Sequence, residues 1–542
     1  MGTQDQALAG GDGASASRGL LYLALAAALV PFAYLVHRFD FLCDDAFITF
    51  RYSRNLAEGL GLVYNPPQLE APVEGYSEFL WAGLMALSMK VGASPEVASR
   101  SLSVLAGALM VAGLVRAMVR RYPDAPAAVL TSSLLLGSAP PLAVWSTGGM
   151  ATMPTAALAV ALFLVANGAP PESWRRRALL LGLISAGLTL MRADAALLVA
   201  LILSPPILVG LARRDEGLWR PALAAAATGA LVFFGHMAWR FSVYGDWVPN
   251  TARVKLGFSS AAAGRGLDYV VSAWLSMPGI ALITLGALVG AWCSRRRVGT
   301  AEASGLVALV LGGTAYAISS GGDFMCFARF LVPVIPFAVL GAAGALASLE
   351  ERTRAGAALA GVAAASLSAL AAFDLHVVPE SARLAFHFRH NQTLMGVRPS
   401  ASELEQWRNM SDRAGYWAAA RRPLQILAFL RQDAAAAVDV EAGMLPALKH
   451  AGPLGRQETF ARKEGDELGA EQLLHRIHAV LWEDEEAFVA EEESVGHEQM
   501  QVGVKVEVLS EGVDGHDNAG YALGLVQRGA HHISDAFVRD TA

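Results

Sequence analysis

Two consecutive stretches decide the fold of this chain, the apolar run GLLYLALAAALVPFAYLV (Gly19–Val36) and the polar stretch HRFDFLCDDAFITFRYSRN (His37–Asn55). The first is long enough to cross a bilayer as a helix. The second carries two adjacent acids, Asp44 and Asp45, close to where that helix leaves the membrane. Because carboxylates at a membrane surface are costly to desolvate, we expect this pair to have a function.

Composition places the chain among polytopic membrane proteins. Its residues are 54% hydrophobic and 17% charged, the mean hydropathy is +0.40, and apolar runs of about 17 to 22 residues recur through the first two thirds of the chain. We read the first run as an uncleaved anchor, because cleavage would cost the acid pair its membrane attachment. A mainly α fold with about eleven transmembrane helices is predicted. The predicted spans are Gly19–Val36, Ser99–Met118, Ala125–Trp145, Ala151–Asn167, Ala178–Met191, Ala195–Ala212, Pro221–Trp239, Val270–Trp292, Ala303–Ser319, Phe330–Leu349 and Ala355–Phe373.

Domain organisation follows from the same change in composition. Residues 1–18 precede the transmembrane domain 19–373, and residues 374–542 have the mixed charge of a water-facing domain, for which orienting an acceptor is a hypothesis. The net charge of −6 and the lack of a large basic patch argue against nucleic acid. Three cysteines are too few for a disulfide scaffold, although Cys43 and Cys326 could pair or remain thiols. No metal-ligand spacing is present, so neither a metal nor a cofactor is expected.

The arginine clusters predict the topology. They are Arg116/Arg120/Arg121, Arg175–Arg177, Arg213–Arg214, Arg295–Arg297 and Arg352/Arg354. All five fall on the side of the N-terminus if the short apolar segment Glu78–Val91 does not cross, and the positive-inside rule favours that arrangement. We therefore predict a cytoplasmic N-terminus, an outer loop from His37 to Ala98 in which Glu78–Val91 is an interface helix, and an outer C-terminal domain.

With this topology, six polar segments from distant parts of the sequence share the outer face. They are Asp44-Asp45 with Arg51 and Arg54; Val73-Glu74-Gly75-Tyr76; Ser146-Thr147-Gly148-Gly149; Arg192-Ala193-Asp194; Tyr244-Gly245-Asp246-Trp247-Val248-Pro249-Asn250 with Arg253 and Lys255; and Gly321-Gly322-Asp323-Phe324-Met325 with Arg329. Each one alone is also an ordinary helix cap, turn or ion pair. Their shared face is what indicates a site.

Sugar transfer from a lipid-linked donor fits these residue types. The reaction needs a carboxylate to accept the proton of the acceptor hydroxyl, and Asp44 or Asp45 can supply it. It also needs cations to stabilise the departing phosphate. The available cations are Arg51, Arg192, Lys255 and Arg329.

Several motifs are similar to those of the GT-C glycosyltransferases, most closely the mycobacterial terminal β-(1→2) arabinofuranosyltransferase family and its bacterial relatives. The motifs are DDAFITFRYSRNLAEG (Asp44–Gly59), GLVYN (Gly61–Asn65), VEGYSEFLW (Val73–Trp81), YGDWVPNT (Tyr244–Thr251), GGDFM (Gly321–Met325) and RFLVP (Arg329–Pro333). The resemblance covers about residues 19–373. It implies a GT-C fold in the bacterial inner membrane, a polyprenyl-phosphate sugar donor, an inverting mechanism and Asp44 as the base.

Two motifs depart from the family pattern. The acid that usually follows Gly-Leu is replaced in the segment Gly148-Gly149-Met150-Ala151-Thr152, and the Arg-Pro-Asp/Glu-Gly motif appears as Arg192-Ala193-Asp194-Ala195. The sugar, arabinofuranose or another single sugar, and the glycan or lipid acceptor are not fixed by the residues. The donor-site candidates are Arg51, Arg54, Glu74, Tyr76, Arg192, Asp194, Asn250, Lys255, Asp323 and Arg329.

Two other classes of protein remain open at this stage. A transporter or lipid flippase could use the same charges as a permeation path, although transporters tend to carry them near the membrane midplane. A non-catalytic membrane scaffold is the second alternative.

Overall fold

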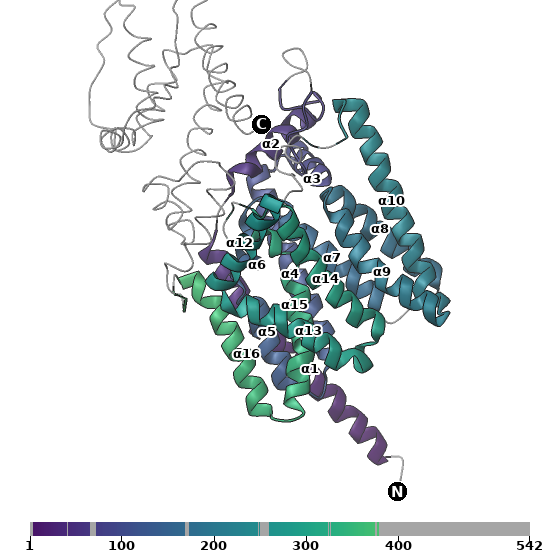
Figure 1. Ribbon diagram of the computed structural model, residues 1–542, viewed down its shortest axis with the longest axis vertical. Helices are drawn as coiled ribbons and strands as arrows, with labels where there is room; N and C mark the ends of the chain where they lie inside the picture. The colour runs from purple at the N-terminus through teal and green to yellow at the C-terminus, as the bar shows by residue number, and fades with distance from the viewer. Residues whose placement is uncertain are drawn as a thin grey trace, which may run out of the picture. The chain divides into compact units, whose positions relative to one another are not determined.

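The computed structural model describes residues 4–40, 42–65, 72–168, 173–247, 249, 260–323, 325, 327–373, 375 and 377–378, and every regular element in these ranges is helical (Figure 1). Asn250, Lys255, Cys326 and all but three positions of the predicted C-terminal domain lie outside these ranges. The elements are α1 (Gln4–Arg38), α2 (Asp44–Ala57), α3 (Phe79–Lys90), α4 (Pro95–Arg121), α5 (Pro126–Gly137), α6 (Pro140–Thr147), α7 (Thr152–Asn167), α8 (Trp174–Met191), α9 (Ala195–Arg213), α10 (Glu216–Tyr244), α12 (Ser260–Ser276), α13 (Pro278–Val298), α14 (Thr300–Ser319), η1 (Arg329–Leu331), α15 (Ile335–Glu350), α16 (Arg354–Ala369) and η2 (Leu370–Phe373).

The helices confirm a mainly α, polytopic membrane protein. Within the described ranges, seven helices are long and apolar enough to cross a membrane, or eight if the bent pair α5 and α6 forms one span. This number is below the predicted eleven. Two of the predicted spans correspond to α7 and α15, which have 16 residues each and are apolar but short. A third corresponds to α8, whose first turn carries Arg175–Arg177.

Proline moves the boundaries of three predicted spans. The predicted span Val270–Trp292 is divided at Met277, where Pro278 begins α13. The predicted span Ala125–Trp145 is divided where Pro140 begins α6, and the two helices bend by 41°. The predicted span Phe330–Leu349 begins as a 3-10 turn, so α15 starts at Ile335 after Pro333. A proline has no N–H to donate and a fixed φ, so it starts a helix more readily than it continues one.

The segment between α1 and α4 does not cross between the two ends of the helical bundle. Arg100, near the start of α4, forms an ion pair with Asp40, just after α1, with 2.7 Å between Nη1 and Oδ1. The end of α1 and the start of α4 are therefore neighbours, and α2 and α3 lie at that same end (Figure 1). We call it the site end.

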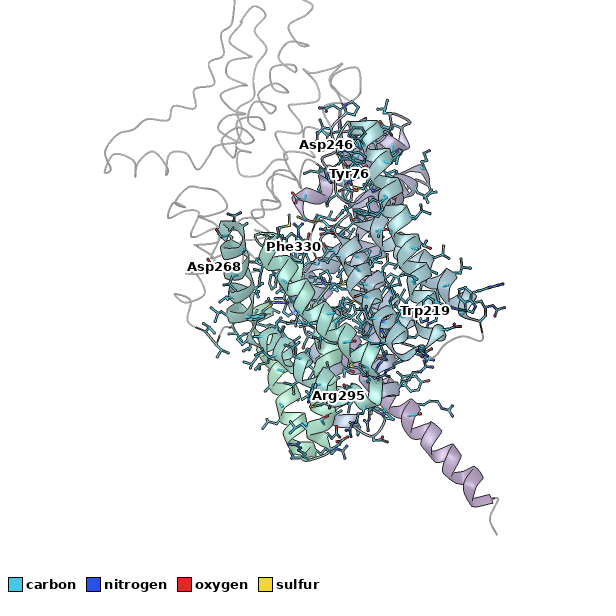
Figure 2. All side chains as sticks on the ribbon, turned by 45° about the vertical axis from the view of Figure 1, so that its right-hand side comes forward. Tyr76, Trp219, Asp246, Asp268, Arg295 and Phe330 are labelled. Carbon is cyan, nitrogen blue, oxygen red and sulfur yellow. The ribbon has the colours of Figure 1, made fainter. Side chains whose placement is uncertain are left out.

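The opposite end of the bundle collects the arginine clusters, and we call it the arginine end. Arg121 at the end of α4 pairs with Glu302 at the start of α14. Arg297 near the end of α13 lies 3.7 Å from Asp124 and 3.9 Å from Glu351. Figure 2 shows Arg295 toward the end away from Tyr76 and Asp246. The separation of polar motifs from arginine clusters thus follows directly from helices that alternate in direction.

Candidate functional site

The acid pair opens helix α2. Cys43 is the N-cap residue in extended conformation and α2 begins at Asp44. Acids in a first turn are favoured by the helix dipole, so the two acids suit the start of a helix. The backbone N–H of Cys43 donates to the carbonyl oxygen of Gly148 at 3.0 Å, so the start of α2 is fixed to the turn between α6 and α7.

That turn depends on Gly149. Its φ is +79°, a left-handed conformation that favours glycine. A Cβ added there would lie 2.7 Å from Leu42 Cδ2 and 2.9 Å from Ala46 Cβ, and the carbonyl oxygen of Gly149 accepts from Trp81 Nε1 at 2.9 Å. The turn therefore binds both α2 and α3.

Replacing Gly149 by alanine should loosen the start of α2. The added methyl group meets Leu42 and Ala46 in a backbone conformation that alanine disfavours. We therefore expect the free energy of unfolding to fall by about 1–3 kcal/mol and the activity to fall with it. Thermal unfolding of the purified protein measures the effect. Gly59 also has a positive φ, +85°, but no atom within 4 Å. Gly59→Ala is thus the control for backbone strain alone, and equal losses in both variants would contradict the contact with α2.

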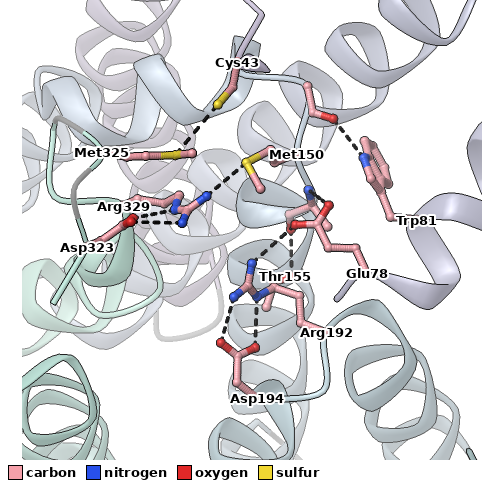
Figure 3. A network of polar contacts seen from close by, with 12 residues as sticks. Cys43, Glu78, Trp81, Met150, Thr155, Arg192, Asp194, Asp323, Met325 and Arg329 are labelled. Atoms are coloured by element: carbon pink, nitrogen blue, oxygen red, sulfur yellow. Dashed lines mark hydrogen bonds and ion pairs between the residues drawn. The ribbon is translucent and has the colours of Figure 1, made fainter. Parts of the chain in front are cut away.

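A buried arginine lies beside this turn (Figure 3). Arg329 is 6% exposed and its guanidinium donates to both carboxylate oxygens of Asp323, at 2.6 and 3.1 Å. Its Nη1 donates to Met150 Sδ at 3.1 Å, and its guanidinium carbon lies 5.4 Å from the centre of the Trp145 ring. Sulfur is a weak hydrogen-bond acceptor. An anionic oxygen at this edge of the guanidinium would therefore form a stronger hydrogen bond with the same N–H.

The backbone before Arg329 is strained. Phe327 and Ala328 have φ values of +52° and +50° without being glycine. Such conformations cost about 1–2 kcal/mol per residue and persist only where the surroundings hold them. The Phe327 ring packs edge-on against Phe39 with 5.1 Å between centroids. Arg329 follows this strained turn directly, as the first residue of η1.

A second, partly buried ion-pair network joins α3 to the α8–α9 turn (Figure 3). Arg192 donates to both oxygens of Asp194, at 2.9 and 2.8 Å, and to Glu78 Oε1 at 3.3 Å. The other oxygen of Glu78 accepts from the N–H of Ala151 at 3.1 Å, and Tyr316 OH donates to Asp194 at 2.9 Å. Glu78 is 1% exposed.

Burial and pairing oppose each other in the pKa values of these groups. Burial raises the pKa of Glu78 although Arg192 opposes it. Burial also acts to raise the pKa of Asp194, but Arg192 outweighs it and the net direction is downward. Burial acts to lower the pKa of Arg329, which Asp323 and then Asp45 raise above its ordinary range. Arg329 therefore stays charged, and Asp45 contributes to the field that keeps it so.

The described part of the chain does not bring every predicted residue into these networks. Arg54 pairs with Glu58 at 2.7 Å on the surface of α2, and Arg51 Nε donates to the carbonyl of Tyr64 at 3.1 Å. Both bonds are exposed. Among the described cations of the predicted set, Arg329 is buried and Arg192 is partly buried. Asn250 and Lys255 lie outside the described residues.

Glu78, Met150 and Trp145 were not among the predicted site residues. The sequence shows Glu78 as one charge in an apolar segment, and only its N-cap position at α3 aims it at Ala151. The sequence of the segment Gly148–Thr152, which contains Met150, indicates only that the acid of the similar motif is absent. Within the described residues, no group of three or more His, Cys, Asp or Glu could hold a metal ion. Cys43 is a thiol whose sulfur lies 3.7 Å from Met325 Sδ.

Glu74 and Tyr76 belong to a different cluster, between the first loop and the end of α10. Glu74 Oε2 lies 2.5 Å from Arg240 Nε, with the two side chains 2% and 1% exposed. The groups that influence the charge of Glu74 are Arg240 and Asp246. Burial raises the pKa of Glu74 from 4.5 to about 7, and Arg240 compensates only in part.

This shift predicts a pH dependence of stability. Because the pKa of Glu74 is raised in the folded state, its contribution to stability is complete below about pH 4.5 and is lost as pH rises toward about 7. The free energy of unfolding should fall by at most about 3 kcal/mol over this range. In Glu74→Gln this component is absent, so the difference in unfolding temperature between wild type and variant should change between pH 4.5 and 7. A difference that stays constant over this range would show that Glu74 does not titrate there.

Comparisons with known proteins add one likeness. No protein-family model and no curated protein matches the chain. Among solved structures, it is similar to ArnT from Cupriavidus metallidurans, crystallised with undecaprenyl phosphate, at 18% identity and a TM-score of 0.47 over 79% of this chain and 74% of ArnT. At this level of similarity, the function has to be argued from the contacts of the site.

Proposed function

We propose that this protein is a GT-C glycosyltransferase that moves one sugar from a polyprenyl-phosphate donor to a glycan or lipid acceptor at the outer face of the bacterial inner membrane. The observation that carries the proposal is the guanidinium of Arg329, which is buried, charged and turned with one N–H toward a sulfur atom beside the start of α2. An anionic oxygen would be a far better partner for that N–H than a thioether.

The chemistry assigns one role to each group. The oxygen of the acceptor hydroxyl bonds to the anomeric carbon while the bond from that carbon to the phosphate oxygen breaks. The hydroxyl proton passes to Asp44, and the departing polyprenyl phosphate keeps the electron pair. Arg329 stabilises the negative charge that develops on the phosphate. Attack from the face opposite the leaving group inverts the anomeric centre.

The placement of charge supports an enzyme with a surface site over a transporter. Arg192, Arg329 and their carboxylates lie in turns at the site end, beside α2 and α3, rather than half-way along the crossing helices. A permeation path is expected to place ionisable groups near the midplane. An isoprenoid tail could lie between the bundle and the lipid while its phosphate reaches the site end.

A direct assay tests the proposal. Purified protein in nanodiscs is incubated with a set of polyprenyl-phosphate sugars and candidate glycans, and transfer is followed by the mass of the acceptor and by release of polyprenyl phosphate. We expect one donor to support transfer with inversion. Failure of every donor, together with no measurable binding of polyprenyl phosphate, would favour a transporter or a scaffold.

A further inference from the structure

Helix α12 packs closely on the segment that carries Arg329. A Cβ added at Gly266 would collide with the carbonyl oxygen of Ile318 near the end of α14, so the two backbones approach as closely as glycine allows. Tyr269 lies three residues further along α12 and therefore on the same face. Its hydroxyl oxygen accepts a hydrogen bond from the backbone N–H of Phe330 at 3.0 Å, and Phe330 directly follows Arg329.

This bond completes the turn that begins at Arg329. Within η1, the N–H of Leu331 donates to the carbonyl oxygen of Ala328 at 2.8 Å. The first N–H groups of a helical turn have no partner inside that turn, and for Phe330 the acceptor comes from α12. The hydroxyl of Tyr269 therefore supplies, from a distant part of the sequence, a hydrogen bond that the turn itself cannot provide.

The ring of Phe330 has a tyrosine ring from each of two helices within contact distance. Its centroid lies 6.3 Å from that of Tyr269 on α12 and 6.1 Å from that of Tyr316 on α14, within the range of aromatic pairs. Tyr269 is 6% exposed, and the hydroxyl of Tyr316 donates to Asp194. The residue after Arg329 is thus held by its main chain and by its side chain.

The backbone on the other side of Arg329 needs such support. Phe327 and Ala328 have positive φ values, and strained conformations of this kind persist only where the surrounding structure holds them. The hydrogen bond between Tyr269 and Phe330 is a tertiary contact next to this strain. It also leaves the guanidinium of Arg329 free of any direct contact with Tyr269 through that bond, because the bond engages the main chain alone.

We propose that Tyr269 is a positioning residue, which through its hydrogen bond to the backbone of Phe330 holds the guanidinium of Arg329 in the orientation that binds the donor phosphate. Tyr269 acts through Arg329 and is not itself assigned a contact with the donor. That the ligand is a polyprenyl phosphate rests on the proposed function. The hold on the turn around Arg329 does not require it.

Four variants separate positioning from stability. Tyr269→Phe removes the hydroxyl and keeps the ring, so it tests the hydrogen bond alone. Tyr122→Phe is the matched control, because it makes the same change in a tyrosine that is 2% exposed and directly follows α4 at the arginine end. Asp323→Asn, alone and combined with Tyr269→Phe, tests whether Tyr269 acts through Arg329. The readouts are amide hydrogen exchange over residues 327–332, the unfolding temperature, the Kd for polyprenyl phosphate and the donor kcat/KM.

Tyr269→Phe should speed exchange over residues 327–332 about tenfold, raise the Kd for polyprenyl phosphate about five- to tenfold and lower kcat/KM by a similar factor. Tyr122→Phe should leave exchange over these residues, Kd and kcat/KM at wild-type values, whatever its unfolding temperature. The losses in unfolding temperature of Tyr269→Phe and Asp323→Asn should be less than additive in the double variant, because both act on the same arginine.

Unchanged exchange in Tyr269→Phe would overturn the inference, since the hydroxyl would then not hold the turn. Faster exchange with an unchanged Kd would also overturn it, because the bond would be merely structural. Fully additive losses in the double variant would show that Tyr269 does not act through Arg329. If the wild type binds no polyprenyl phosphate, the proposed function fails, whereas exchange and the double variant need no donor and still decide whether Tyr269 positions Arg329.

Discussion

Asp44→Asn is expected to lower sugar transfer by about 10²- to 10⁴-fold while the protein remains folded and still binds polyprenyl phosphate. This is the range by which a positioned general base contributes. Asparagine has nearly the shape of aspartate but cannot accept the proton of the acceptor hydroxyl. The measurement is kcat for transfer, with the Kd for polyprenyl phosphate determined on the same preparation. The loss should therefore appear in kcat and not in Kd.

The competing explanation for Asp44 is that it only stabilises the first turn of α2, and it makes a different prediction. An acid in the first turn of a helix contributes about 0.3–1 kcal/mol through the helix dipole, so an Asp44 with this role alone would give transfer within a few-fold of wild type. Asp40→Asn is the matched control: Asp40 lies in the same loop, is exposed and pairs with Arg100. Transfer that survives in Asp44→Asn at the level of Asp40→Asn would remove Asp44 as the base.

Asp45→Asn should behave differently from both. Asp45 raises the pKa of Arg329 and so contributes to the field at the proposed phosphate position. Its removal is expected to change the affinity for polyprenyl phosphate more than kcat. Since the order within the acid pair rests on resemblance, the comparison of the two asparagine variants decides it.

Much of the arrangement could be predicted from the sequence because helices that cross a membrane alternate in direction. If Glu78–Val91 does not cross the membrane, counting the crossings along the chain is enough to place three points on the same side: the end of α1, the start of α4 and the end of α8. The helix boundaries were less predictable. Pro140 and Pro278 interrupt apolar runs whose hydropathy is continuous, and hydropathy carries no information on the missing N–H.

Side-chain partners could be predicted only where they are local. The pair Arg54–Glu58 has i,i+4 spacing on α2, which is a signal for a surface ion pair and an argument against a role for Arg54 in phosphate binding. The contact of Glu78 with Ala151 joins residues 73 positions apart. No spacing rule reports it, because it depends on how α3 packs against the turn before α7.

That contact leads to the sharpest test of the phosphate position. In this chain the segment at Met150 lacks the acid that the family resemblance leads one to expect, while Glu78 brings a carboxylate to the neighbouring residue Ala151. Met150 itself faces Arg329 Nη1 at 3.1 Å. We therefore read Glu78 as the carboxylate of this part of the site, supplied from another segment.

Met150→Glu should weaken donor binding by about ten- to a hundredfold. A second carboxylate would engage Arg329, which already binds Asp323, and would stand where the phosphate oxygen is proposed to bind. Two like charges about 4 Å apart repel by about 4 kcal/mol at an effective dielectric constant of 20, which sets the upper limit of the effect. Met150→Gln has the same shape without the charge and should cost less than tenfold, and Met150→Leu should stay within about threefold of wild type.

Moving the charge rather than adding it should restore binding. In Met150→Glu combined with Glu78→Gln, the number of carboxylates returns to that of the wild type, and the glutamine at position 78 can still accept from Ala151 N–H. We expect the Kd for polyprenyl phosphate to recover at least tenfold over Met150→Glu alone. If Met150→Glu binds as tightly as Met150→Gln, Arg329 does not carry the phosphate. If the double variant is weaker than either single variant, Glu78 is needed at its own position for Arg192 and Ala151, and its carboxylate cannot be exchanged for one at position 150.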